Sequence, residues 1–467
     1  MDVPSGCATL GAMTLQRDLR ALRDGGPVPP PPARRPRRWD LALAWLVILL
    51  PALTLAAILA ARQRVDDLSE RMVRDTNALF ARTYPRPAHV DPPGPAIPGE
   101  GLARHMARIG EAAKLHGSDP VLRQVTSGVL PVSSLPPVIA ADLERLEPAL
   151  EALLGATRGE RVELADPCLS SGGDGGWSGL SFAASLVGVR MRLAMAAGDP
   201  ERALRDGLDG LAVGRDVALG RQLVGRMAAA SVVERLAPSL GEAIDRLPGA
   251  GADRDASRRL RVIRDALPPF SVTLSDEWVC TQLMIGEALP ASARARLDPR
   301  ARALVERDGL KDTAFWQRFT FRDGWRDMRA AQDALVATAD LPETERAAAW
   351  SRVQDRLLRQ PNPVAAIAMP DFGKYARRAA ASVRRLDALV LVAAAGAFRS
   401  TRGAWPGAVA DLASAGELSA AEAARLGEAE LEVARGDGLA ITVSLPRGDE
   451  RDPAEVRFVL RGRVGGY

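Results

Sequence analysis

The sequence predicts a mainly α-helical protein with a single transmembrane helix, an irregular bundle of helical hairpins, and a C-terminal unit of one long helix and three antiparallel strands. An uninterrupted apolar run near the N-terminus predicts the transmembrane helix. Apolar residues at helical spacing through most of the chain predict the bundle, and alternation at period two near its end predicts the strands. The expected boundaries are a Pro- and Arg-rich tail at 1–39, the transmembrane helix at 40–62, a helical stalk with a Pro-rich spacer at 63–100, a helical body at 101–360 and the helix-plus-sheet unit at 361–467.

Residues 41–61 are 21 apolar residues without a charge. A helix of that length crosses a hydrocarbon core of roughly 30 Å. Four arginines lie between positions 34 and 38, whereas the two arginines that follow the run are offset by two aspartates. The positive-inside rule therefore predicts a single-pass anchor in a bacterial inner membrane, with the N-terminus cytoplasmic and the bulk of the chain periplasmic. A cleaved signal peptide is the alternative, but the apolar stretch of a signal peptide is about 7–15 residues long, shorter than the run in this chain.

The net positive charge of the chain comes from the predicted tail. There are 62 basic and 58 acidic residues, a net charge of +4, and the tail alone holds seven arginines and three aspartates. The rest of the chain is therefore neutral. A nucleic-acid interface needs a basic face that neutralises phosphates, so no nucleic-acid partner is expected.

The helical body shows its clearest signals between residues 180 and 247. A helix from Leu180 to Ala197 is expected to end at Gly198, after which Asp199 and Pro200 provide an N-cap and first turn for the next helix. A third helix is expected from about Arg221 to Leu236, with a stop at Pro238. The first pair resembles the second half of a tetratricopeptide-type hairpin, with matching residues at Ala196, Gly198, Asp199, Ala203 and Leu204.

The C-terminal unit begins after a linker at 360–373, with a long helix from about Tyr375 to Thr401. Three alternating runs predict the strands, with turns at Gly436-Asp437-Gly438 and Pro446-Arg447-Gly448. We expect an antiparallel meander whose apolar face is covered by the long helix. The apolar residues of the three runs are Leu431 and Val433, then Ile441, Val443 and Leu445, then Val456, Phe458 and Leu460.

The segment between the long helix and the strands, GAWPGAVADL at 403–412, carries a resemblance to a known family. Its helix, G-x-aromatic-P segment and small sheet resemble the layout of the type II secretion pseudopilins, with matching residues Gly403, Trp405, Pro406 and Leu412. That layout implies an association with a secretion or pilus-like assembly. The whole chain resembles uncharacterised membrane-anchored bacterial proteins, a resemblance that implies no particular activity.

The sequence offers few residues for catalysis. The three histidines, His89, His105 and His116, have no carboxylate or cysteine at metal-ligand spacing, so neither a metal nor another cofactor is expected. The H-E-x-x-H and G-x-S-x-G motifs are absent from the sequence. The chain offers many acidic pairs, and Asp276 and Glu277 beside Trp278 are one candidate pair for hydrolysis; the alternative is that they cap a helix N-terminus.

Two further groups of residues have open interpretations. Cys168 and Cys280 fall on the external side of the membrane, where they either form a disulfide or remain two separate buried thiols. An aromatic cluster with interleaved arginines is either a core anchor or a binding surface for sugars or proteins. Its members are Phe315, Trp316, Phe319, Arg322 and Trp325.

Together these features predict a non-catalytic, membrane-anchored scaffold or interaction protein of the envelope, whose partners are other envelope proteins. Two alternatives remain. One is an envelope hydrolase that uses an acidic pair. The other is a peptidoglycan- or carbohydrate-binding module that uses the aromatic cluster.

Overall fold

The computed structural model describes residues 49–50, 53–54, 69–82, 99–158, 176–220, 222–284, 289, 291–308, 328–359, 372–434, 438–446 and 453–461. The chain divides into two compact units, Met1–Asp67 and Leu68–Tyr467. In the first unit, residues 49–50 and 53–54 are helical, and Leu49, Leu50 and Leu53 are 48%, 60% and 64% exposed. The rest of the predicted transmembrane helix lies outside the described residues.

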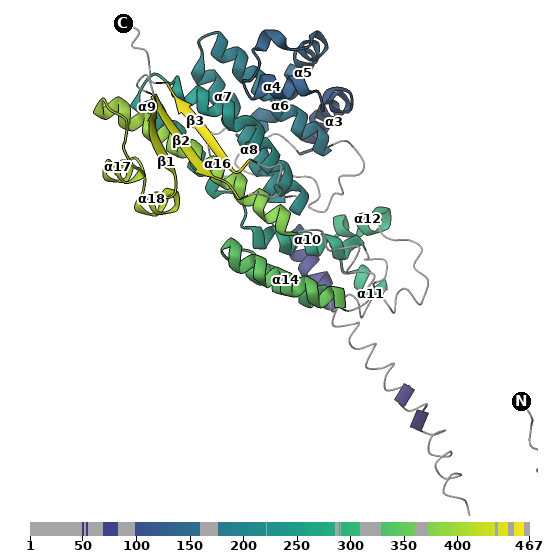
Figure 1. Ribbon diagram of the computed structural model, residues 1–467. Helices are drawn as coiled ribbons and strands as arrows, with labels where there is room; N and C mark the ends of the chain where they lie inside the picture. The colour runs from purple at the N-terminus through teal and green to yellow at the C-terminus, as the bar shows by residue number, and fades with distance from the viewer. Residues whose placement is uncertain are drawn as a thin grey trace, which may run out of the picture. The chain divides into compact units, whose positions relative to one another are not determined.

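The second unit is mostly helical, with a small sheet near its C-terminus (Figure 1). Its named helices are α3 (Gly99–His116), α4 (Pro120–Thr126), η1 (Val132–Ser134), α5 (Pro137–Ala156), α6 (Gly176–Ala196), α7 (Pro200–Gly220), α8 (Gln222–Asp245), α9 (Ala250–Asp265), α10 (Phe270–Met284), α11 (Ala291–Arg294), α12 (Pro299–Asp308), α14 (Glu343–Arg359), α16 (Phe372–Arg402), α17 (Val409–Ser414) and α18 (Ala420–Leu426). Two more helices cover residues 69–80 and 328–338. The strands are β1 (Glu430–Ala434), β2 (Gly438–Ser444) and β3 (Glu455–Leu460).

One hydrophobic core runs through most of this unit. It contains buried side chains from α3 to α9, from α16 and from β2 and β3. Within the described residues, the window Gly179–Ala196 of α6 is the one helical segment long and apolar enough to cross a membrane, but 78% of it is buried in the protein. Since α6 packs against α3, α7 and α8, it is a core helix of the bundle.

The turn between α6 and α7 confirms the local prediction. Gly198 has φ +79°, a left-handed conformation that ends α6 without a side-chain clash. Asp199 Oδ1 then accepts a hydrogen bond from the Arg202 backbone N–H at 2.9 Å, and Pro200 begins α7.

The predicted stop at Pro238 is wrong, because α8 continues through it to Asp245. Proline in a helix interior removes one hydrogen bond and costs about 3 kcal/mol. Burial on both sides of Pro238 offsets that cost, since Leu236, Leu240 and Ile244 are each at most 1% exposed.

The C-terminal sheet confirms the predicted meander, with strand order β1-β2-β3 and antiparallel pairing throughout. Ile441 at its centre pairs with Leu431 of β1 and Phe458 of β3, so the predicted apolar residues share one face. The long helix α16 packs on this face, and β3 also contacts α8. A Cβ at Gly241 of α8 would lie 2.4 Å from the Phe458 ring, so this close approach requires glycine.

Two smaller cores attach the remaining helices. The helix at 69–80, part of the predicted stalk, packs against α10 and α12 through Met72, Val73, Leu79 and Phe80. It is therefore part of the compact unit. The helix at 328–338 and α14 pack around Trp350, which lies against Phe270 of α10 at a ring-centroid distance of 6.2 Å.

A candidate interaction site where the helices meet the sheet

The segment singled out by the sequence as G-x-W-P turns the chain from α16 into α17. Gly403, with φ +74°, ends α16 and donates its backbone N–H to the Arg399 carbonyl at 2.8 Å. Trp405 is half-buried, and the Arg399 guanidinium lies over its ring, 4.4 Å from the ring centroid. Pro406 and Leu412 are buried. The residues that match the pseudopilin layout thus lie in the turn between α16 and α17 and in α17 itself, and the Arg399 guanidinium makes a cation–π contact with Trp405.

A cavity of about 350 Å³ opens beside this turn. Its walls come from the α8–α9 turn, from α16, from Trp405 and from the end of β3. The lining residues are Ile244, Asp245, Pro248, Gly249, Ala250, Val392, Gly396, Arg399, Ser400, Trp405 and Leu460. The wall is apolar at Ile244, Val392 and Leu460 and carries charge at Asp245 and Arg399, a combination typical of a binding site for an amphipathic group.

Two carboxylates fix the geometry around the cavity. Asp245 Oδ2 accepts a hydrogen bond from the Arg461 backbone N–H at 3.1 Å, which ties the end of β3 to α8. Asp253 of α9 is fully buried, and a Cβ at Gly396 would lie 3.1 Å from its carboxylate. Gly396 therefore lets α16 approach α9 directly beneath the cavity.

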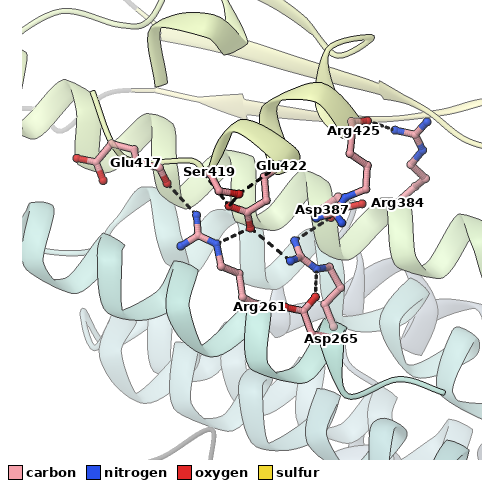
Figure 2. Close-up of polar contacts among 9 residues, drawn as sticks. Arg261, Asp265, Arg384, Asp387, Glu417, Ser419, Glu422 and Arg425 are labelled. Carbon is pink, nitrogen blue, oxygen red and sulfur yellow. Dashed lines mark hydrogen bonds and ion pairs between the residues drawn. The ribbon is translucent and has the colours of Figure 1, made fainter. Parts of the chain in front are cut away.

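An ion-pair network joins α9, α16 and α18 through residues other than those that line the cavity (Figure 2). Arg264 of α9 donates to Asp387 of α16 at 2.9 Å and to Glu422 of α18 at 3.3 Å. Arg261 of α9 donates to the same Glu422 oxygen at 2.6 Å. The Arg264 and Asp387 side chains are only 5% and 1% exposed, so each charge depends on its partner.

The pKa values of the network reflect this pairing. Burial would raise the pKa of Glu422, but hydrogen bonds from the Ser419 backbone N–H and from Arg261 outweigh it and lower that pKa to about 2. Burial raises the pKa of Asp387, against the opposing charges of Arg425 and Arg264. Although burial opposes the charge of Arg264, the carboxylates of Asp265, Asp387 and Glu422 raise its pKa.

The two carboxylates of the predicted acidic pair make separate contacts, one with Arg82 and the other with the start of α8. Asp276 and Glu277 lie in the middle of α10, so the prediction that they cap its N-terminus is wrong. Asp276 accepts two hydrogen bonds from Arg82 at 2.7 and 2.9 Å, and Glu277 accepts one from the Leu223 backbone N–H at the start of α8 at 3.1 Å. Burial raises the pKa of both carboxyl groups, with Arg82 opposing it at Asp276 and the Leu223 N–H opposing it at Glu277.

The other predicted site residues lie partly outside the described residues. The aromatic cluster Phe315, Trp316, Phe319, Arg322 and Trp325 falls within 309–327 and is not described. Cys280 on α10 is disulfide-bonded, but Cys168 is outside the described residues, so their pairing stays a prediction. His116 lies 3.5 Å from Asp142, and no group of three or more His, Cys, Asp or Glu side chains in the described ranges could hold a metal ion.

No protein-family model matches the sequence, and no curated protein or solved structure is significantly similar to it. The tetratricopeptide-like and pseudopilin-like resemblances therefore rest on the quoted residues alone. The cavity beside Trp405 was not predicted, because its walls come from positions 244–250, 392–405 and 460, which only the tertiary fold brings together. The sequence singled out Trp405 only as one of the four residues that match the pseudopilin layout.

Proposed function

We propose that the chain is a non-catalytic, membrane-anchored scaffold or protein-interaction protein of the bacterial envelope. Residues 40–62 cross the inner membrane once, the N-terminus is cytoplasmic and the compact unit is periplasmic. The observation that carries the proposal is the cavity beside Trp405, whose walls combine α8, α9 and α16 of the helical bundle with β3 of the sheet.

The anchor is supported by the residues of its helix that are described. Leu49, Leu50 and Leu53 are exposed in the first unit, so these large apolar side chains lack a protein environment there. Lipid supplies the environment that such side chains require. The flanking arginines orient the helix, as the sequence predicts.

The non-catalytic part of the proposal is supported by the contacts of four carboxylates. Asp276 and Glu277 each serve a structural contact, and Asp387 and Glu422 neutralise arginines inside the protein. A general acid or nucleophile needs access to its substrate, and these carboxylates are turned toward the protein interior.

The partner that fits the Trp405 cavity is an envelope protein, in keeping with the secretion or pilus-like assembly that the C-terminal layout suggests. Its contact segment places an apolar side chain against Ile244, Val392 and Leu460. Aromatic and arginine side chains in a small concave site are the residues that most often dominate protein–protein affinity.

Affinity capture of the tagged full-length protein from crosslinked native membranes tests this function. We expect a reproducible envelope partner with the wild-type chain and about 30-fold weaker recovery with Trp405→Ala, the effect of losing a hot spot worth about 2 kcal/mol. Leu115→Ala is the matched control, because Leu115 is a 76% exposed apolar residue on α3, away from the cavity.

Because Trp405 also packs against the core, a second variant is needed. Ser400 is exposed and lines the cavity, so Ser400→Phe fills the cavity without removing a core contact. Recovery of the partner that is unchanged by both variants, with the melting temperature preserved, would contradict the assignment of the site.

A further inference from the structure

The exposed face of α14 carries three arginines that none of the described carboxylates neutralises. Arg352, Arg356 and Arg359 recur at the spacing that places side chains on one face of a helix. With Asp355 they line a surface hollow of about 450 Å³, and all four are exposed. We call these four residues the α14 hollow.

The three arginines of the α14 hollow differ from the ion-paired arginines elsewhere in the described chain, because they have no carboxylate partner there. Across the described ranges, none of Arg352, Arg356 and Arg359 makes an ion pair or a side-chain hydrogen bond, and Asp355 makes none with them. Three cations therefore surround one hollow with a single acid. Guanidinium groups in such an arrangement bind phosphate oxygens with two hydrogen bonds each, so the hollow fits a phosphate-bearing anion.

Two contacts connect α14, through the helix at 328–338, with the helix at 69–80. Trp350 Nε1 donates to the Leu335 carbonyl at 3.3 Å, which ties α14 to the helix at 328–338. Arg329 in turn donates to Asp75 of the helix at 69–80 at 3.3 Å. That helix begins eight residues after the apolar run ends, a length of chain that bridges at most about 29 Å.

We propose that the α14 hollow binds the phosphate headgroup of an anionic phospholipid and thereby holds the compact unit against the membrane. The inference rests on the proposed membrane anchor. An exposed guanidinium near an anionic bilayer strengthens association by about fivefold per residue. Once the chain is anchored, the three arginines need only orient the unit, because the anchor already keeps it near the lipid.

Photo-crosslinking in nanodiscs tests the inference on the full-length chain. Ala348 is exposed, one helical turn before Arg352 and on the same face, so it takes the photoreactive residue benzoylphenylalanine. The nanodiscs contain either phosphatidylcholine alone or phosphatidylcholine mixed with phosphatidylglycerol. We expect a lipid adduct at position 348 at least fivefold more abundant with phosphatidylglycerol, and much less of it at high ionic strength.

Matched variants distinguish binding at the α14 hollow from a general effect of the protein's positive charge. The triple variant Arg352→Gln, Arg356→Gln and Arg359→Gln removes the adduct. The control triple Arg145→Gln, Arg246→Gln and Arg258→Gln removes the same charge from side chains that are 61%, 49% and 54% exposed elsewhere, and it leaves the adduct unchanged. Benzoylphenylalanine at Glu144, an exposed position on α5, gives no lipid adduct.

Three results would overturn the inference. The first is equal adduct yield in the two lipid mixtures, and the second is a yield that the α14 triple variant does not change. The third is loss of the adduct on addition of inorganic phosphate at constant ionic strength, which would show that the hollow prefers a soluble anion. Failure of the anchor is distinguishable, because the protein would then leave the nanodiscs during gel filtration whatever their lipid.

Discussion

The junction of α9, α16 and α18 and the outer face of α14 are both rich in arginine, but they use it in opposite ways. Arg264 at the junction is 5% exposed on its side chain and contacts Asp265, Asp387 and Glu422. Arg352, Arg356 and Arg359 on α14 are exposed and contact none of the described carboxylates. A buried cation requires neutralisation, whereas an exposed cation is solvated by water and leaves its field available to an external anion.

Arg226 of α8 departs from both patterns. It is 4% exposed, and no acceptor in the described part of the chain lies within hydrogen-bond distance of its Nε or Nη1. Burial lowers its pKa to about 10. Among the described residues, the junction, Arg226 and α14 therefore form a series in which arginine is buried with carboxylate partners, buried without one, and exposed without one. The predictions below follow this series from the largest expected effect to the smallest.

Arg264→Ala is expected to produce the largest effect. The substitution leaves the Asp387 carboxylate, 1% exposed, without its nearest cation and removes the contacts that join α9 to α16 and α18 through Arg264. Removing one partner of a buried ion pair costs about 3–5 kcal/mol in the free energy of unfolding. Urea unfolding of the detergent-solubilised chain measures it.

The double variant Arg264→Met with Asp387→Leu provides the control for that prediction. It removes both charges and replaces them with apolar side chains of similar size, so we expect a much smaller loss than for Arg264→Ala. If the single and double variants lose the same stability, the junction depends on packing and not on its charges.

Arg226→Met is expected to raise the free energy of unfolding, whereas Arg264→Ala lowers it. An unmatched buried guanidinium opposes folding, and an apolar side chain of similar length avoids that desolvation cost, so the free energy of unfolding should rise by about 1–4 kcal/mol. The same urea titration measures the change. A clear loss of stability would mean that Arg226 has an acceptor in the folded protein.

The low pKa of Glu422 predicts a specific pH dependence. Because this pKa falls from an ordinary value of 4.5 to about 2 on folding, the stabilisation is complete above about pH 4.5 and is lost as the pH falls toward 2. The raised pKa of Asp387 acts in the opposite direction, so the useful quantity is the difference between wild type and Glu422→Gln. We expect that difference in stability to shrink between pH 4.5 and 2, and a constant difference would contradict the pairing.

The α14 triple variant is expected to have the smallest effect on stability. Exposed side chains without partners contribute little to folding, so replacing Arg352, Arg356 and Arg359 with glutamine should change the free energy of unfolding by less than about 0.5 kcal/mol. Thermal unfolding in a zwitterionic detergent measures it. A large loss would place these arginines among the groups that hold the fold together and would remove the contrast with the junction.

Local signals in the sequence predicted the parts of the fold that short-range chemistry controls. The Gly198-Asp199-Pro200 turn, the long helix α16 and the three strands follow from caps, turn residues and apolar periodicity. The same reasoning failed at Pro238, because tertiary burial on both sides of the proline outweighed its local cost.

The candidate site was not predicted, because the sequence singled out Trp405 only as part of the pseudopilin-like layout. Nothing in the sequence separates Arg264, which is buried against three carboxylates, from Arg352, which is exposed, since both are arginines on amphipathic helices. Asp276 and Glu277 show the same limit, because their partners Arg82 and Leu223 are distant in the chain. Pairing of this kind is a property of the tertiary fold.

The most direct test of the central claim, that the cavity beside Trp405 binds an envelope protein, is site-specific crosslinking in native membranes. Benzoylphenylalanine replaces Ala404, an exposed residue next to Trp405, or Glu144 on α5 as the control. The account predicts one defined protein adduct at position 404, which is absent at position 144 and absent in the Trp405→Ala variant. The same adducts at both positions, or none at position 404 in a correctly folded chain, would contradict it.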